Sequence, residues 1–184
     1  MGDGRLNEER TPAKPSERLK GVKRVFLSLG SNRANRLANI RAALEQLGEA
    51  GIEVCRVSSF YKTEPVGFAP QAWFVNCVAE VRTSLMPLRL LKTLKSVERQ
   101  LGRRSRVFQG PRPIDIDILL YENVVVRSSV LTIPHARLGE RRFMLIPLRE
   151  LAPQVRHPVV KRTVLEMLRE TQDLSQVVRW KAER

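Results

Sequence analysis

Two aspartates stand two residues apart in an otherwise apolar run, and this spacing suits metal chemistry. The run reads Gly110-Pro-Arg-Pro-Ile-Asp-Ile-Asp-Ile-Leu-Leu-Tyr121. Alternate side chains of a strand point to opposite faces, so Asp115 and Asp117 share one face and the isoleucines take the other. Neighbouring carboxylates repel each other, and a divalent cation removes that cost. The pair could hold magnesium against a polyphosphate. The alternative is a solvent-facing strand whose acids pair with nearby cations.

Five arginines lie just before the aspartates or beside them, with no carboxylate among them. They are Arg99, Arg103, Arg104, Arg106 and Arg112. A planar guanidinium group matches phosphate oxygens and can stabilise charge that develops during phosphoryl transfer. A basic loop alone is typical of a solvated surface. Its position beside the paired aspartates favours a phosphate-binding function.

Two further groups of residues could bind ligands. His135 is followed by Arg137, Arg141 and Arg142, so it could donate to a phosphate, although a structural hydrogen-bonding role is the alternative. The turn-prone segment 63–67 precedes Phe74 and Asn76, which offer an aromatic face and an amide to a planar heterocycle. The alternative there is an ordinary loop and strand start. Asn32, after Gly30, is expected to cap the next helix or to brace a neighbouring loop.

The elements that position these residues are predicted in the order βαββαβ. Periodicity predicts strands at residues 24–30, 52–61, 74–83 and 114–121, and helices at 35–47 and 88–101. This order indicates an α+β fold, a ferredoxin-like sandwich with two helices on one face of an antiparallel sheet. We also expect a hairpin from 124–126 and 130–133, and short C-terminal helices at 142–151 and 164–171, the first broken by Pro147.

Composition indicates a single cytoplasmic domain. Among the 184 residues we expect a disordered polar leader at 1–23, one domain at 24–175 and a basic tail at 176–184. No uncharged run approaches the ~20 residues that cross a bilayer, and the N-terminus lacks the apolar core of a signal peptide. Cys55 and Cys77 are interpreted as packing residues. The net charge of +14 favours an anionic partner such as nucleic acid, an acidic membrane or a polyphosphate.

Together these motifs resemble the 6-hydroxymethyl-7,8-dihydropterin pyrophosphokinase family. The likeness covers residues 24–158, and its most specific part is Gly-Pro-Arg followed by Asp-x-Asp. The resemblance implies a core that binds ATP with two Mg²⁺ ions and a pterin alcohol in adjacent pockets. It implies transfer of the β,γ-pyrophosphate to the pterin hydroxymethyl group, with release of AMP, in folate synthesis. The expected protein is a monomer whose partners are these small molecules, with no nucleic acid and no membrane.

The resemblance also assigns roles to individual positions. Asp115 and Asp117 match the metal-binding aspartates, and the other catalytic positions, which contact phosphate, are Arg103, Arg112, His135 and Arg141. The pterin-binding positions are Phe74 and Phe143, which sandwich the ring, Asn76 on its edge, and the nearby backbone of Thr63, Glu64, Pro65 and Val66. The ATP-binding positions include these phosphate contacts and also Leu91, Lys95, Glu98, Arg106, Ile118 and Thr132, with Ser105 as the alternative to Arg106.

Two other classes of protein compete with this interpretation. Basic ferredoxin-like modules bind RNA by stacking bases on exposed aromatic residues of central strands. Aromatic residues are only 5% of this chain, and the corresponding strand face carries aspartates that would repel phosphate without metal. Another magnesium-dependent nucleotidyl or phosphoryl transferase is the second rival. Its products would be ADP or free pyrophosphate instead of AMP, and a fold alone does not separate these activities.

Overall fold

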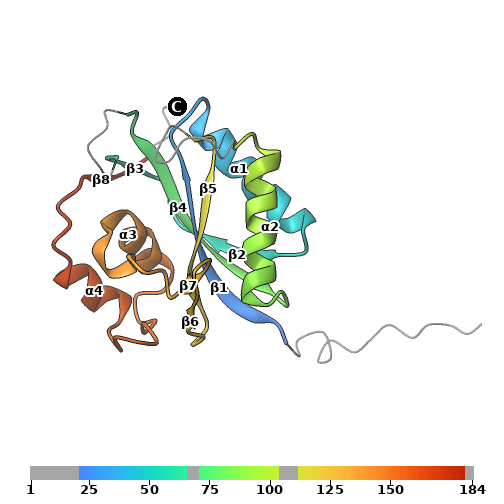
Figure 1. Cartoon of the computed structure of the whole chain (residues 1–184). Helices are drawn as coiled ribbons and strands as arrows, with labels where there is room; N and C mark the ends of the chain where they lie inside the picture. Colours follow the sequence, from blue (N-terminus) through green and yellow to red (C-terminus); the bar gives the residue numbers. More distant parts are fainter. Residues whose placement is uncertain (1–20, 66–70, 104–111, 181–184) are drawn as a thin grey trace, which may run out of the picture.

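An antiparallel sheet forms the centre of the protein (Figure 1). The computed structural model describes residues 21–65, 71–103 and 112–180. The strands of this sheet are β1 (Lys23–Ser31), β2 (Glu53–Val57), β3 (Tyr61–Thr63), β4 (Phe74–Thr83), β5 (Asp115–Tyr121) and β8 (Val177–Arg179). Their order is β5-β1-β4-β3-β8, with β2 also paired to β4. The strand that carries both aspartates is therefore an edge strand of this sheet, and among the described strands it pairs only with β1.

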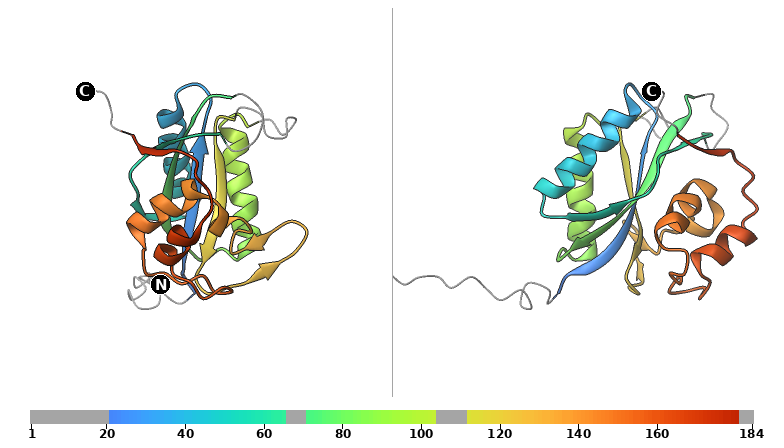
Figure 2. Two further views of the ribbon diagram at one scale, coloured as in Figure 1. Left: turned by 90° about the vertical axis from the view of Figure 1, so that its left-hand side faces the viewer. Right: turned by 180° about the vertical axis from the view of Figure 1, so that it is seen from behind.

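Helices cover both faces of the sheet, so the described residues form three layers (Figure 2). One face carries α1 (Arg36–Glu49) and α2 (Pro87–Gln100). The other carries α3 (Arg142–Leu151) and α4 (Val164–Glu170), preceded by the short helix η1 (Leu138–Glu140). In the sequence, a separate hairpin of β6 (Val126–Arg127) and β7 (Thr132–Ile133) follows β5 and precedes the helices of the second layer. None of the described helices is long and apolar enough to cross a bilayer.

Each face of the sheet has its own apolar cluster. On β1, Val25, Leu27 and Leu29 belong to the cluster beneath α1 and α2, whereas the intervening Phe26 belongs to the cluster beneath α3 and α4. Strands buried on both faces are expected to read as nearly continuous apolar runs, as β1 and β4 do. Leu119 of β5 belongs to the second cluster, so Asp115 and Asp117, which share its parity, lie on the α3 face.

Local sequence explains where the helices begin. Asn35 caps α1, since its Oδ1 accepts a hydrogen bond from the backbone N–H of Ala38 at 3.1 Å. Pro87 opens α2, where the N–H that proline lacks would have no intrahelical partner. Thr163 and Glu166 form a capping box at the start of α4.

The structure confirms the mixed α/β class and differs from the predicted elements at three places. The strand predicted at 52–61 ends at Val57, and a separate strand begins at Tyr61; between them Ser58 Oγ accepts the N–H of Val78. The prediction that Pro147 breaks its helix is wrong: α3 continues through Pro147, which is buried. β8 was not predicted. It is a three-residue strand that depends on pairing with β3, which no local pattern encodes.

Candidate active site

The carboxylates of Asp115 and Asp117 lie side by side on the α3 face of β5. Asp115 pairs with Gly30 across the ladder to β1, and Asp117 pairs with Ser28. Ile114 and Ile116 are fully buried on the opposite face and Ile118 nearly so. The alternation expected from the sequence is therefore present, and it sets both acids on one surface.

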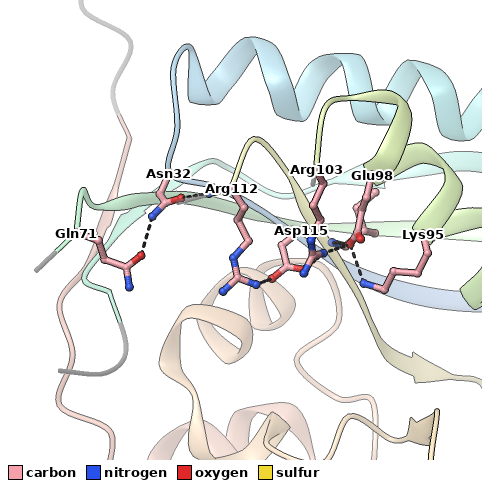
Figure 3. Close-up of polar contacts among 8 residues, drawn as sticks. Asn32, Gln71, Lys95, Glu98, Arg103, Arg112 and Asp115 are labelled. Atoms are coloured by element: carbon pink, nitrogen blue, oxygen red, sulfur yellow. Dashed lines mark hydrogen bonds and ion pairs between the residues drawn. The ribbon is translucent and has the colours of Figure 1, made fainter. Parts of the chain in front are cut away.

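Asp115 is bound by two arginines in this structure (Figure 3). Arg103 Nη1 lies 2.5 Å from its Oδ1, and Arg112 Nη1 contacts its Oδ2. Arg103 follows the end of α2 and Arg112 lies three residues before Asp115, so the sequence and the fold together bring them to the carboxylate. Two of the five predicted loop arginines are thus beside the acids, while Arg104 and Arg106 lie outside the described residues.

Glu98 anchors this arrangement from the last turn of α2 (Figure 3). Its side chain is 2% exposed, and its Oε1 lies 2.6 Å from Arg103 Nη1 and 2.8 Å from Lys95 Nζ. The same oxygen accepts the backbone N–H of Ile116 at 2.8 Å, an edge donor of β5. Burial raises the pKa of Glu98, an effect that Lys95, the Ile116 N–H and Arg103 oppose. In the described structure Glu98 acts as an internal anchor that ties α2, Arg103 and β5 together.

The surroundings of Asp117 disfavour the negative charge on its carboxylate. Burial and the neighbouring charge of Asp115 raise the pKa of Asp117, and the cations Lys95, Arg103 and Arg141 only partly compensate. A carboxylate in this state gains from a bound cation. The donor set fits Mg²⁺, which prefers carboxylate oxygens and completes its shell with phosphate oxygens and water. No cluster of three or more acidic, histidine or cysteine ligands exists among the described residues, so phosphate and water would have to supply the other ligands.

His135 lies beside β5 as a neutral imidazole. Its backbone N–H donates to the carbonyl of Leu119 at 2.9 Å, and its Nδ1 accepts the N–H of Arg137 at 3.2 Å. Burial, together with the charges of Arg141 and Arg137, lowers the pKa of His135 to about 4. Because Nδ1 is an acceptor in this geometry, the ring proton resides on Nε2. His135 can therefore donate one hydrogen bond from Nε2 without carrying a positive charge.

Two guanidinium groups at the site have unsatisfied donors. Nε of Arg112 and Nε of Arg141 are buried and have no hydrogen-bond partner among the residues that the structure describes. Burial and the nearby Arg137 also lower the pKa of Arg141, whose guanidinium lies 5.5 Å from the ring centre of Phe143. Buried donors normally have partners, so these two mark a place where an anion would be favoured.

The residues predicted to hold a flat heterocycle meet on the same face of the sheet. Asn76 pairs with Gly30 on β1, and its Nδ2 donates to Thr63 Oγ1 at 2.7 Å. A Cβ on Gly30 would collide with Oδ1 of Asn76 and come within 3.8 Å of the Phe74 ring. Glycine is thus required at position 30 because Asn76 and Phe74 occupy the space above it. Across the sheet, the order is Asp115, Gly30 and Asn76.

Asn32 braces two loops, which was one of the two roles expected for it. Its Oδ1 accepts the N–H of Arg112 at 2.8 Å, and its Nδ2 donates to Gln71 Oε1 at 3.0 Å (Figure 3). Asn35, and not Asn32, caps α1. Gln71 was not predicted as a site residue, and its position within a loop gave no periodic signal.

The remaining predicted positions are placed as follows. Leu91 and Ile118 pack in the cluster beneath α1 and α2, Thr132 is exposed on β7, and Phe143 is half-buried in the first turn of α3. Glu64 and Pro65 are half-buried beyond β3, and Val66 lies outside the described residues. The carboxylate of Glu64 bonds to the backbone of Gln176, a contact that sequence reasoning missed.

Known proteins share both the sequence and the fold. The family model for 7,8-dihydro-6-hydroxymethylpterin-pyrophosphokinase (HPPK) matches residues 26–153. A 2-amino-4-hydroxy-6-hydroxymethyldihydropteridine pyrophosphokinase from Aquifex aeolicus is 42% identical over 142 residues, which cover 77% of this chain and 88% of the relative. The protein of the same description from Bacillus subtilis is 42% identical over 132 residues, covering 71% and 79%.

Longer proteins contain a similar region. The folic acid synthesis protein fol1 of Schizosaccharomyces pombe is 42% identical over 145 residues, which are 78% of this chain but 20% of that protein. The crystal structure of an HPPK-DHPS protein in complex with substrates superimposes with a TM-score of 0.63 at 16% identity. That alignment covers 80% of this chain and 43% of the other, and it shows a common fold.

Proposed function

The chain belongs to the 7,8-dihydro-6-hydroxymethylpterin-pyrophosphokinase family, and we propose that the α3 face of its sheet is the surface on which it performs that family's reaction. The protein is a pyrophosphokinase of folate biosynthesis that uses ATP as co-substrate. It transfers pyrophosphate from ATP to the hydroxymethyl group of 6-hydroxymethyl-7,8-dihydropterin, and AMP is released. The basic nucleic-acid-binding module is not favoured by these relatives.

The observation that carries the proposed site is the pairing of Asp115 and Asp117 with unsatisfied arginine donors. Asp115 and Asp117 would hold two Mg²⁺ ions, which neutralise the triphosphate and polarise its phosphorus for attack. The carboxylate of Asp117, whose pKa is raised, gains most from such a cation. Arg103 and Arg112 would then turn from Asp115 to phosphate oxygens, since guanidinium groups bind both anions in the same bidentate manner.

Two other side chains complete the phosphate site in this proposal. Arg141 offers the buried Nε that has no partner among the described residues. His135 offers Nε2–H from a neutral ring, so it donates to a phosphate oxygen and adds no charge. The nucleotide would be bordered by Leu91, Lys95, Glu98, Ile118 and Thr132. Of these, Glu98 would act through its ion pairs with Lys95 and Arg103.

The pterin would lie beside the amide of Asn76, between Phe74 and Phe143. Asn76 is held by Thr63 and presents its amide oxygen over Gly30, where it can accept from a ring N–H. Thr63, Glu64 and Pro65 would contribute backbone groups at one end of the ring. In this arrangement the pterin hydroxyl and the ATP phosphates meet between Asn76 and Asp115, which flank Gly30 on neighbouring strands.

The proposal also covers the type of core, the oligomeric state and location, and the partners of the protein. The strand order β5-β1-β4-β3 with α1 and α2 on one face supports a ferredoxin-like core to which α3, α4 and β8 are added. We also propose that the protein acts as a cytoplasmic monomer. Pterin and ATP are its proposed partners, in place of nucleic acid or membrane.

The deciding experiment is incubation with ATP, magnesium and the pterin alcohol, followed by separation of the nucleotides. We expect AMP and a pterin pyrophosphate in equal amounts. Formation of ADP, or of free pyrophosphate without a modified pterin, would refute the assignment. The Asp117→Asn variant is the control, since AMP formed by that preparation at the wild-type rate would point to a contaminating activity.

A further inference from the structure

The segment that follows α4, residues 171–180, contacts both sides of the proposed pterin site. We call this segment the C-terminal strap; it runs from α4 past α3 to the edge of the sheet at β8 (Figures 1 and 2). Neither motifs nor periodicity assigned it a role, and its last residues were expected to be a basic tail. The strap forms hydrogen bonds with the start of α3 and with the segment after β3, and both of these carry proposed site residues.

At its first end the strap holds the beginning of α3. Asp173 Oδ2 accepts the backbone N–H of Arg142 at 2.7 Å, and Asp173 Oδ1 accepts the N–H of Ser175 at 2.9 Å. Arg141, the N-cap of α3, makes no side-chain cap hydrogen bond, so Asp173 supplies a cap from a distant part of the chain. The bonded N–H lies between Arg141 and Phe143, two residues of the proposed site.

Three residues later the strap holds the loop on the opposite side. The N–H of Gln176 donates to Glu64 Oε2 at 2.8 Å, and the N–H of Glu64 donates to the carbonyl of Gln176 at 3.2 Å. Val177 then pairs with Thr63, whose Oγ1 accepts from Asn76. The far end is fixed by Trp180, whose N–H donates to the carbonyl of Phe60 at 2.7 Å.

We propose that the C-terminal strap is a positioning element for the pterin, in which Asp173 and Gln176 set the separation between the Phe143 side and the Asn76 side of the site. This inference rests on the proposed function of those residues. The far half of α3 is held separately, because Glu150 accepts from Ser59 and from the Tyr61 hydroxyl. Loss of Asp173 therefore frees only the first turn of α3, where Arg141 and Phe143 lie.

The test compares two helix caps of the same protein. Asp173→Ala removes the cap of α3, and Thr163→Ala removes the cap of α4, which carries none of the proposed site residues. We expect both variants to lose similar thermal stability. Only Asp173→Ala should raise the KM for the pterin, by up to about tenfold, the limit reached if the free energy of the lost Asp173 hydrogen bond appears in pterin binding. The KM for ATP should rise less than the KM for the pterin, because Arg141 is only one of several proposed phosphate contacts. Asp173→Asn, which keeps an acceptor oxygen, should restore most of the pterin KM.

A second pair of variants tests the other end of the strap. Gln176→Pro deletes the N–H that Glu64 accepts, whereas Arg179→Pro deletes an N–H that faces away from β3 in the alternating ladder. We expect a raised pterin KM for the first variant alone. Equal pterin KM values for Asp173→Ala and Thr163→Ala, or an equal rise in the KM for ATP, would overturn the inference. The wild-type protein must first form AMP and the pterin pyrophosphate, and failure of that step would instead refute the proposed function.

Discussion

Arg103 Nη1 lies 2.5 Å from Asp115 Oδ1, so a proposed phosphate-binding group forms an ion pair with a proposed metal-binding group. Arg112 binds the other oxygen of the same carboxylate. A metal ion that arrives alone must compete with both guanidinium groups. When a triphosphate arrives with the metal, the arginines gain phosphate oxygens in exchange.

The first prediction is that nucleotide strengthens metal binding. We expect Mn²⁺ alone to bind weakly, and its affinity to rise by about tenfold or more in the presence of a nonhydrolysable ATP analogue. Calorimetric titration of Mn²⁺ with and without the analogue measures this, after correction for Mn²⁺ bound by free analogue. Equal affinities in the two titrations would show that the arginines do not compete for Asp115.

The second prediction is that replacing Asp117 and replacing Asp115 change the free energy of unfolding in opposite directions. Asp117→Asn and Asp115→Asn should each lower turnover by at least about a hundredfold, because each removes a proposed metal ligand. Asp117→Asn should raise the free energy of unfolding at neutral pH by about 1 kcal/mol, since it replaces a carboxylate whose pKa is raised by burial. Asp115→Asn should lower that free energy, because Arg103 and Arg112 lose their counter-charge. Urea unfolding of both folded variants checks the opposite signs.

The third prediction concerns Arg112, whose side chain should act mainly on the transition state. Arg112→Ala should lower kcat by about 10² to 10³, the range found for single groups that stabilise developing charge, and should change nucleotide affinity less. The loop anchor should survive, because Asn32 binds the backbone N–H of residue 112 and not its side chain. Arg99→Ala, at an exposed position of α2, is the control. A parallel loss of affinity and turnover would mean that Arg112 binds the ground state equally well.

The fourth prediction is that Glu98 matters for stability far more than an exposed glutamate does. Glu98→Ala should destabilise the protein by about 3 kcal/mol, because it leaves Arg103 and Lys95 partly buried without their shared acceptor. The same substitution also leaves the backbone N–H of Ile116 without a partner. Glu140→Ala is the matched control, since its pair with Arg137 is exposed and should contribute little. Denaturant midpoints of the two variants measure the difference. Similar midpoints would contradict the anchoring role.

The fifth prediction is acid sensitivity that originates at His135. Its pKa is about 4 in the folded protein against an ordinary 6.5, so below pH 6.5 the unfolded chain binds a proton that the folded one does not. The stability associated with neutral His135 is complete above pH 6.5 and is lost as pH falls toward 4, by up to about 3 kcal/mol. His135→Asn should flatten the stability profile between pH 6.5 and 5. His157→Asn is the control, and a larger flattening in that variant would assign the effect to His157.

Sequence alone was most informative where a local pattern and the fold agree. The alternation around Asp115 and Asp117, the stripe of α2 and the β4 run all depend on periods that the chain displays directly. Membership of the family also followed from motifs. The sequence predicted arginines near Asp115 but not their individual contacts, because the spacing of Arg103 and Arg112 does not tell which carboxylate oxygen each one binds.

Contacts between distant segments were not predictable in the same way. Asp173 and Gln176 act through backbone groups of Arg142 and Glu64, and backbone groups carry no residue-specific signal. Pro147 shows the converse case, in which a strong local rule failed. The helix α3 runs through this buried proline, although its nitrogen cannot donate a hydrogen bond to the preceding turn.

The separate apolar clusters on the two faces of the sheet have a consequence for protein engineering. Phe26 and Leu27 are neighbours in the chain, yet one supports the layer that carries Arg141 and Phe143 and the other supports the layer of α1 and α2. Repacking at positions such as Ile40 and Leu47 changes the part of that core that lies on α1, a helix that carries none of the proposed site residues. Thermostable variants are best sought there, where a gain in rigidity should cost the least activity.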